Sequence, residues 1–359
     1  MPTRTPLRID ADFHLPQASI DDLLPYLDEF WRGQVVDREL PSMPFRLTSY
    51  PPNSPLTRNS DFEGLDVSAA LDKFGTDVAI ASMLHGAVAL HNPDMRAVLM
   101  SAVNDYVAKE WLDREPRLRG SIYVSGEDIP ASVAEIERLA GDKRFVQVLL
   151  LAMQEIHHGN RQYWPLYEAC EKHGLTLAIH AGGLYRLPPS VSGWPSYQFE
   201  DYVMQFMVFE NILTALVGEG VFHKFPDLNV VFLESGFAWL PTIIWRNDKT
   251  WRGVRPEVPW LDRKPSEIMA GRVFLSLQPS DPPGPEELKQ IIKHIGGTDM
   301  LLYSTDYPHR QFTGSDPLPA GLPEEGLPGI LSGNALKAYP RLAAEPALRE
   351  AAAILEETT

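Results

Sequence analysis

The sequence predicts an α/β fold, a closed (β/α)8 TIM barrel, on three observations. Eight short and mostly continuous apolar runs are distributed along the chain, as is typical of parallel strands that are buried on both faces. Amphipathic helical patterns separate most of these runs. Polar clusters stand at or just after the ends of several runs, where the active sites of such barrels form. An open doubly wound sheet is the alternative, which we disfavour because no Gly-x-Gly-x-x-Gly motif follows any run.

The elements alternate in chain order. The expected strands are residues 8–15, 78–84, 120–124, 146–151, 175–181, 230–234, 273–277 and 300–305. The expected helices are residues 67–74, 92–115, 129–140, 162–173, 201–217 and 285–295. Helix boundaries follow from stop and start residues, since Pro116 and Gly174 each end a pattern and Pro285 begins one. We expect one domain over residues 1–359, with its core at 8–340 and a C-terminal helix at 342–359.

Prolines mark the expected loops. The chain has 32 of them, and they cluster after predicted strands, in segments 41–55, 188–195, 282–285 and 317–328. All four segments begin at the C-terminal end of a strand, which in a barrel is the face that carries the active site. Long loops in a compact domain are usually functional or disordered. Their Trp, Tyr, Arg and Pro content favours ordered lids over the C-terminal face.

Composition limits the class of protein. The chain has 359 residues, 44% of them hydrophobic, which is enough for a large core. Its formal net charge of −16 argues against nucleic acid and against an anionic membrane surface. No signal peptide, no membrane span and only one cysteine, Cys170, are evident. We expect a cytoplasmic protein with a small-molecule substrate, forming a homo-oligomer (a dimer).

The candidate chemistry begins at an acid–x–acid–x–His run, Asp10 to His14. In a strand, Asp10, Asp12 and His14 point to one face, and burying them without a partner would be costly. Three further clusters at the ends of later strands bring His180, Glu234 and Asp306. We expect these three as catalytic residues and, together with Asp12 and His14, as metal ligands. Carboxylates and imidazoles together predict one or two divalent transition-metal ions, with zinc favoured and iron or manganese as alternatives.

Several motifs in chain order carry a family resemblance. They are residues 10–14, 179–183, 222–228, 234–241, 304–309 and 333–335. Together they resemble the amidohydrolase superfamily, and most closely the amidohydrolase-2 branch that contains the aminocarboxymuconate-semialdehyde decarboxylase-like enzymes. The resemblance implies that Asp12 and His14 replace a strand-one His-x-His pair. It also implies that His180 is the strand-five ligand and Asp306 the strand-eight aspartate.

Two departures from the family pattern bear on the reaction. Asp12 stands where the family usually has histidine, and Glu234 stands where its decarboxylases carry a histidine that assists proton transfer. A carboxylate is the poorer proton donor at neutral pH, so Glu234 favours a metal-dependent hydrolase. In that hypothesis Asp306 deprotonates a metal-activated water that attacks an ester, thioester, amide or lactone. The alternative is a metal-dependent non-oxidative decarboxylase, or a hydratase, of an aromatic or dienoic acid. A non-catalytic barrel is the least favoured hypothesis.

Further residues are candidates for supporting roles. Asp10 is expected to support the ligands or to belong to the barrel floor. The expected substrate-binding residues lie just past strand ends or in the loops that follow them: His309, Trp194, Arg310 and His85.

Overall fold

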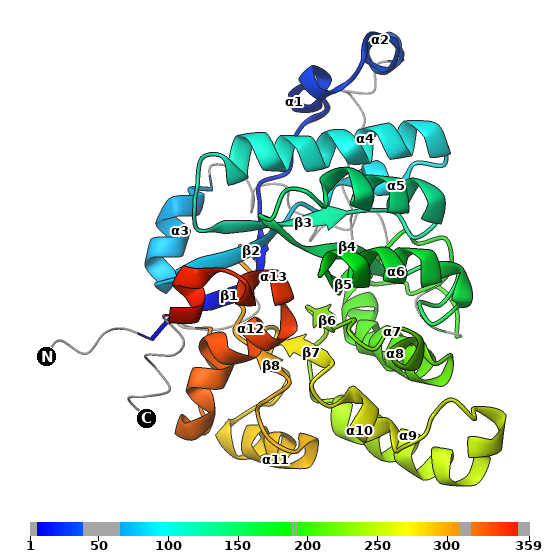
Figure 1. The fold of residues 1–359 in the computed structure, drawn as a ribbon, viewed down its shortest axis with the longest axis vertical. Coiled ribbons are helices and arrows are strands. Elements are labelled where there is room, and N and C mark those ends of the chain that lie inside the picture. Colours follow the sequence, from blue (N-terminus) through cyan, green and yellow to red (C-terminus); the bar gives the residue numbers. More distant parts are fainter. Residues whose placement is uncertain (1–5, 39–64, 189, 191, 309–316, 351–359) are drawn as a thin grey trace, which may run out of the picture.

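The computed structural model describes residues 6–38, 65–188, 190, 192–308 and 317–350. Each of the eight apolar runs forms a strand, every adjacent pair is parallel, and the strands follow one another in chain order (Figure 1). The strands are β1 (Ile9–His14), β2 (Val78–Ser82), β3 (Leu118–Tyr123), β4 (Phe145–Met153), β5 (Thr176–Gly183), β6 (Val230–Leu233), β7 (Val273–Ser276) and β8 (Leu301–Leu302). With helices between the strands, this arrangement confirms the predicted (β/α)8 barrel.

The barrel closes between β1 and the segment after β8. The amide of Ala11 donates to the carbonyl oxygen of Tyr303 at 2.9 Å, and the amide of His14 donates to that of Tyr307 at 2.8 Å. The expected last strand, 300–305, is regular only over Leu301–Leu302. Its remaining amides have other acceptors, because Tyr303 donates to Ile330 and Thr305 to the side chain of Asp10.

Helices alternate with the strands and surround the barrel (Figure 1). They are α1 (Ile20–Leu23), α2 (Glu29–Asp37), α3 (Val67–Phe74), α4 (Pro93–Tyr106), α5 (Ile129–Leu139), α6 (Trp164–His173), α7 (Gln198–Gly218), α8 (Val221–Lys224), α9 (Leu240–Val254), α10 (Pro265–Met269), α11 (Pro285–Ile295), α12 (Asn334–Ala338) and α13 (Pro340–Ala343). Short 3-10 and π helices also occur, among them η3 (Gly86–Ala89) before α4 and η4 (Val107–Leu112), which continues α4.

Local chemistry explains the helix boundaries. The side chain of Asp128 accepts a hydrogen bond from the amide of Ala131 and so caps the start of α5. Gly75 and Gly174 take left-handed backbone angles at the ends of α3 and α6, where other residues would be strained. The helix predicted over 92–115 divides into α4 and the π turn η4, which ends before Pro116.

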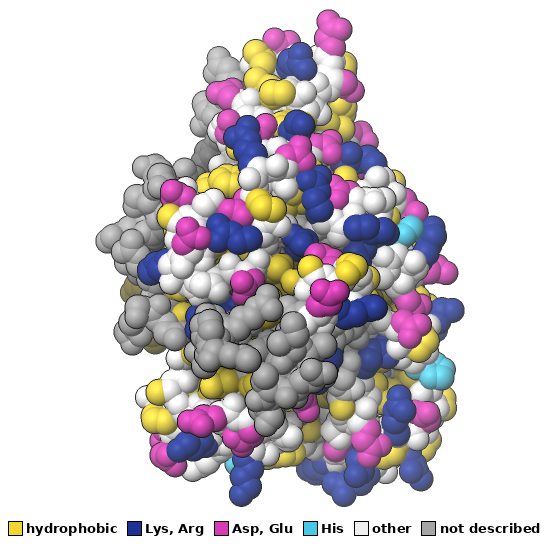
Figure 2. All heavy atoms as spheres, turned by 60° about the vertical axis from the view of Figure 1, so that its left-hand side comes forward, with side chains coloured by type: hydrophobic (Ala, Val, Ile, Leu, Met, Phe, Trp, Pro, Cys, Tyr) yellow, Lys and Arg dark blue, Asp and Glu magenta, His cyan; other side chains and the backbone are white. Residues whose placement is uncertain are grey.

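The surface carries mixed charge. On the face drawn in Figure 2, acidic and basic side chains are interspersed. No helix in the described ranges is long and apolar enough to cross a membrane. Of the predicted C-terminal helix, residues 346–350 are helical and 351–359 lie outside the described residues. Segment 41–55 also lies outside them.

Candidate metal centre and active site

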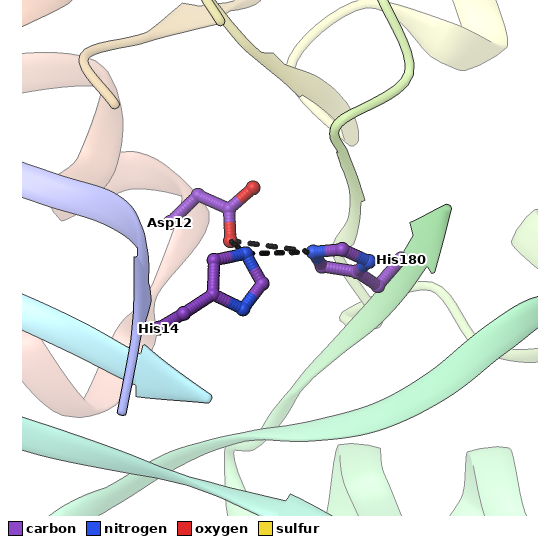
Figure 3. Close-up of side chains that lie close together, drawn as sticks. All are labelled: Asp12, His14 and His180. Atoms are coloured by element: carbon purple, nitrogen blue, oxygen red, sulfur yellow. Dashed lines mark hydrogen bonds and ion pairs between the residues drawn. The ribbon is translucent and has the colours of Figure 1, made fainter. Parts of the chain in front are cut away.

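Three side chains from two strands converge inside the C-terminal end of the barrel. Asp12 and His14 come from β1 and His180 comes from β5, and all three are buried (Figure 3). The two histidine Nε2 atoms are 3.3 Å apart. Oδ1 of Asp12 lies 3.7 Å from Nε2 of His14 and 3.6 Å from Nε2 of His180. The three donor atoms therefore form a nearly equilateral triangle.

This triangle fits a divalent ion. Nitrogen and oxygen ligands about 2.1 Å from a metal in tetrahedral geometry lie about 3.4 Å from one another. Neither carboxylate oxygen of Asp12 has a hydrogen-bond partner among the described residues, although the side chain is fully buried. A buried carboxylate that accepts no hydrogen bond is costly, and a cation beside it and the two histidines would satisfy it. The three side chains can therefore hold a divalent metal ion.

The tautomer of His180 supports this assignment. Its Nδ1 lies 2.8 Å from the carbonyl oxygen of Ala181, so Nδ1 carries the proton and the lone pair of Nε2 faces the triangle. Without an ion, burial lowers the pKa of this ring, but the charges of Asp12 and Glu234 outweigh burial and raise the pKa to about 9. The site therefore has a strong attraction for positive charge.

Asp306 adds a fourth polar group. It follows β8, its φ is +51°, and its Oδ1 lies 3.2 Å from Nε2 of His14. Its Oδ2 is buried without a hydrogen-bond partner in the described structure. Burial raises the pKa of Asp306 well above its usual value, and the charges of Glu234, Asp12 and Asp10 raise it further. Asp306 can therefore hold a proton beside the metal site.

Asp10 supports the site rather than joining the triangle. Its Oδ1 accepts hydrogen bonds from the amides of Thr305 at 3.0 Å and Asp12 at 3.1 Å, and its Oδ2 accepts one from the Thr305 hydroxyl at 2.6 Å. Burial raises its pKa to about 7, against the lowering effect of the Thr305 hydrogen bonds. Asp10 thus joins β1 to the segment that carries Asp306.

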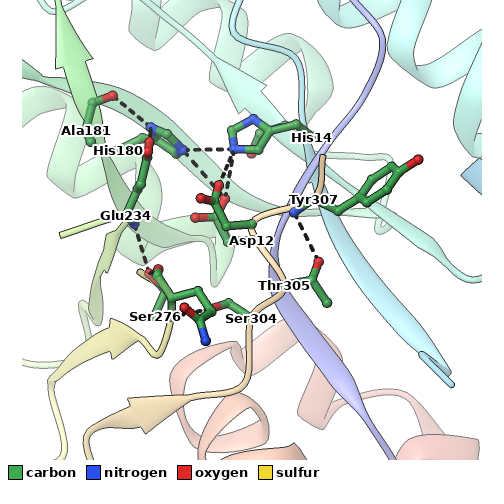
Figure 4. Close-up of polar contacts among 12 residues, drawn as sticks. Asp12, His14, His180, Ala181, Glu234, Ser276, Ser304, Thr305 and Tyr307 are labelled. Atoms are coloured by element: carbon green, nitrogen blue, oxygen red, sulfur yellow. Dashed lines mark hydrogen bonds and ion pairs between the residues drawn. The ribbon is translucent and has the colours of Figure 1, made fainter. Parts of the chain in front are cut away.

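Glu234 lies on the other side of His180 from the triangle (Figure 4). Its Oε2 is 3.8 Å from Nδ1 of His180, whereas the metal-facing atom of that ring is Nε2. Its amide donates to the hydroxyl of Ser276 at 2.9 Å, and its φ is +53°. In the described part of the chain, one group of three potential ligands occurs, and Glu234 is not in it.

A clamp joins the loop after β6, directly beyond Glu234, to the loop after β7, and the sequence analysis missed it. The carboxylate of Asp281, in the loop after β7, accepts hydrogen bonds from the amides of Phe237 and Ala238. Gly236 has a φ of +61°, and a Cβ at this position would collide with Oδ2 of Asp281. Gly236, directly after Glu234-Ser235, is the one signal in the sequence that points to this close approach.

The expected substrate-binding residues divide into two groups. His309 and Arg310 lie outside the described residues. Trp194 is 45% exposed in the loop after β5. His85 caps η3 by accepting from the amide of Ala87, and it is fully buried, which lowers its pKa to about 4. The structure therefore places His85 at the buried start of η3 and not in the triangle.

Comparison with known proteins agrees with the fold. The amidohydrolase family model matches residues 9–341. No curated protein matches the sequence. Similar solved structures include an amidohydrolase from Mycobacterium avium subsp. paratuberculosis K-10, with TM-score 0.70 and 17% identity over 94% of this chain and 100% of that one. Another is 2,6-dihydroxybenzoate decarboxylase from Rhizobium, with TM-score 0.66 and 20% identity over 94% and 99%.

A third similar structure contains a metal. It is 5-carboxyvanillate decarboxylase from Novosphingobium aromaticivorans DSM 12444 complexed with manganese, with TM-score 0.67 and 20% identity over 93% of this chain and 96% of that one. The two neighbours named for a specific reaction are thus decarboxylases of aromatic acids. This finding contradicts the predicted hydrolase and favours the alternative, and it does not support zinc in particular. The match over nearly the whole length shows that the chain belongs to the amidohydrolase family.

Proposed function

We propose that this protein is a metal-dependent, non-oxidative decarboxylase of an aromatic carboxylic acid. The observation that carries the proposal is the position of Asp306: a buried carboxyl whose Oδ1 contacts the metal triangle and whose Oδ2 has no partner in the described structure. Such a group can hold a proton for a carbon atom of a substrate bound at the triangle. The decarboxylases of similar fold support the same reaction class.

We assign one divalent ion to Asp12, His14 and His180, and we favour Mn²⁺. Mixed oxygen and imidazole donors suit this ion, and a structure of similar fold contains it. The bound ion supplies positive charge that can hold the substrate carboxylate and a neighbouring oxygen. The zinc expected from the sequence is the alternative that metal analysis would distinguish.

Asp306 carries the proton in this scheme. Protonated Asp306 transfers its proton to the ring carbon that bears the carboxylate. The bond between that carbon and the carboxylate then breaks, carbon dioxide leaves, and the electron pair of the bond restores the aromatic ring. The ring carbon keeps the new hydrogen, and the Asp306 carboxylate regains a proton from water.

Glu234 adds to the effect of burial and raises the proton affinity of Asp306 further. Among the charged neighbours of Asp306, Glu234 raises its pKa the most, after burial. Glu234 also lies within 3.8 Å of Nδ1 of His180, where a carboxylate favours the tautomer whose Nε2 faces the ion. A glutamate at this position is therefore compatible with decarboxylation even though it is a poor proton donor.

The test is decarboxylation of a panel of hydroxybenzoates by the manganese-loaded protein in D2O. We expect carbon dioxide release and one deuterium at the ring carbon that lost the carboxylate. Asp306→Asn should lower kcat by about 100-fold or more, because an amide cannot donate this proton.

Asp299→Asn is the matched control, because the Asp299 side chain is 88% exposed. It should keep the wild-type rate. Full metal occupancy without carbon dioxide release from any acid in the panel, or an Asp306→Asn variant with wild-type turnover, would contradict the proposal.

A further inference from the structure

A second group of charged side chains lies at the C-terminal face, outside the metal triangle. One carboxylate, that of Glu127 in the loop after β3, accepts hydrogen bonds from two arginines. Nε of Arg186, in the loop after β5, donates to its Oε1 at 3.0 Å, and Nη1 of Arg96, in the first turn of α4, donates to its Oε2. Both arginines are largely buried, since 6% of the Arg96 side chain and 15% of the Arg186 side chain are exposed.

The two arginines therefore carry one positive charge more than Glu127 can balance. No other carboxylate of the described residues forms an ion pair with either of them. The remaining contacts of Arg186 are neutral, because its Nη2 donates to the carbonyl oxygen of Ala89 and its Nη1 to Nε2 of His91, each at 2.9 Å. A buried charge without a counter-charge is costly, and an anion beside it would lower that cost.

Arg96 leaves one edge of its guanidinium group unused. Its Nη1 donates to Glu127 and to the carbonyl oxygen of Leu90, whereas Nε and Nη2 donate to no group that the structure describes. Neither of these two atoms is sealed from solvent. Their N–H bonds point in nearly the same direction, which matches the two oxygen atoms of a carboxylate.

Other arginines of this chain show what this edge binds. Nε and Nη2 of Arg119 donate to the two carboxylate oxygens of Glu345 at 2.7 and 2.6 Å. Arg144 holds Asp142 in the same way, at 3.0 and 2.7 Å. Arg96 is more deeply buried than either of these arginines, and its corresponding edge has no carboxylate among the described residues.

Arg96 and Arg186 both line a cavity of about 420 Å³. The other described lining residues come from the segments that follow β2, β3 and β4, so the cavity lies at the same face of the barrel as the metal triangle. Its volume is within the range of small-molecule sites. Arg96 also borders a neighbouring cavity between α4 and α5, but Asp28, Asp128 and Glu135 line that cavity and disfavour an anion there.

We propose that the cavity beside Arg96 and Arg186 is a second binding site, for a small organic monocarboxylate whose two oxygen atoms accept hydrogen bonds from Nε and Nη2 of Arg96. One carboxylate balances the one positive charge that Glu127 leaves over. Glu155 is the other carboxylate among the described lining residues, and its repulsion disfavours a dianion such as phosphate. No described lining residue belongs to the metal triangle, so the proposal does not depend on the reaction.

Anomalous scattering tests the position of the ligand. Crystals of the full manganese-loaded chain grown with 4-bromobenzoate should show a bromine peak in this cavity. The carboxylate of the ligand should lie within hydrogen-bond distance of Nε and Nη2 of Arg96. Bromine found only at the metal triangle, or nowhere on the protein, would overturn the proposal.

Titration calorimetry of the same protein tests the chemistry in solution. It should show a site for 4-bromobenzoate that Arg96→Met weakens by about 10-fold or more, the scale of a hydrogen bond to a charged group, and that His180→Ala leaves unchanged. Arg144→Met is the matched control, because Asp142 already occupies the same edge of Arg144, and it should bind as the wild type does.

Arg96→Lys keeps the proposal testable if Arg96→Met does not fold. It retains the positive charge beside Glu127, but a lysine ammonium cannot present two parallel N–H donors, so this variant should also bind 4-bromobenzoate more weakly. Binding that the folded Arg96 variants leave at full strength would overturn the proposal, and so would binding that His180→Ala abolishes. Inorganic phosphate that binds at this site as tightly as 4-bromobenzoate would overturn the assignment of a monocarboxylate.

Discussion

Replacing Glu234 by glutamine should shift the pH dependence of catalysis. The substitution removes one negative charge and keeps the shape of the side chain. A chain of contacts joins the two carboxylates: Glu234 to Nδ1 of His180 at 3.8 Å, Nε2 of His180 to His14 at 3.3 Å, and the same His14 atom to Asp306 at 3.2 Å. With the width of the imidazole ring included, the two carboxylates lie at most about 12 Å apart.

This separation sets a lower bound on the effect. At an effective dielectric constant of about 20, two unit charges about 12 Å apart interact by about 1.4 kcal/mol, or about one pKa unit. Because the charge of Glu234 raises the pKa of Asp306, its removal must lower that pKa. If Asp306 acts as the proton donor, activity falls as the pH rises through its pKa. The falling limb of the profile should therefore move to lower pH by about one unit in Glu234→Gln.

The assay is kcat/KM for decarboxylation against pH, with metal content measured in parallel. Glu286→Gln is the matched control, because the Glu286 side chain is 75% exposed on α11, and its profile should coincide with that of the wild type. A falling limb that stays in place would refute the electrostatic role of Glu234. Movement of the rising limb instead would show that Asp306 acts in its deprotonated form.

Three further predictions follow from the site and the core. When the metal ion is present at about 100 times its Kd, removing it by chelation should lower the Tm of the protein by about 3–4 °C. His180→Ala should abolish this difference in Tm. Equal Tm values for the wild type with and without metal would contradict the site. Gly236→Ala should cost about 1–2 kcal/mol in urea unfolding and lower kcat, because of its positive φ and the contact with Asp281, while Asp281→Ala in the same chain should recover part of the loss. His158 is buried, which lowers its pKa to about 4. The unfolded chain therefore binds a proton at this residue below pH 6.5 and the folded chain does not, so the free energy of unfolding should fall by about 3 kcal/mol as the pH falls from 6.5 towards 4. His158→Gln should reduce this pH dependence in urea titrations from pH 7 to 4.5.

The fold could be predicted because its signals are local. Every strand centre follows from a continuous apolar run, and most helix boundaries follow from a proline, a glycine or a capping carboxylate. The predicted last strand was too long, because the amides of Tyr303 and Thr305 donate to Ile330 and Asp10, which lie far away in the chain. Such competition between acceptors depends on tertiary contacts that periodicity does not contain.

The site could be predicted in part for a similar reason. Parallel strands end at the same face, so Asp12, His14 and His180 had to converge once the barrel was assumed. The clamp by Asp281 was not predictable, because its acceptor lies in one loop and its donors in another. The reaction was predicted wrongly, since the identity of residue 234 was considered without its orientation.

The orientation of Glu234 determines whether its carboxylate acts as a ligand or base, or only as a nearby negative charge. As a ligand or a base, a carboxylate would have to face the substrate or the ion, and hydrolysis would then be the natural inference. Beside Nδ1 of His180, it leaves the metal-facing Nε2 atom unchanged and adds a negative charge behind the ring. That charge raises the proton affinity of Asp306, so Asp306 can hold a proton at a higher pH than an ordinary carboxyl group can. In the proposed reaction, the proton-donating role therefore belongs to Asp306 and not to residue 234.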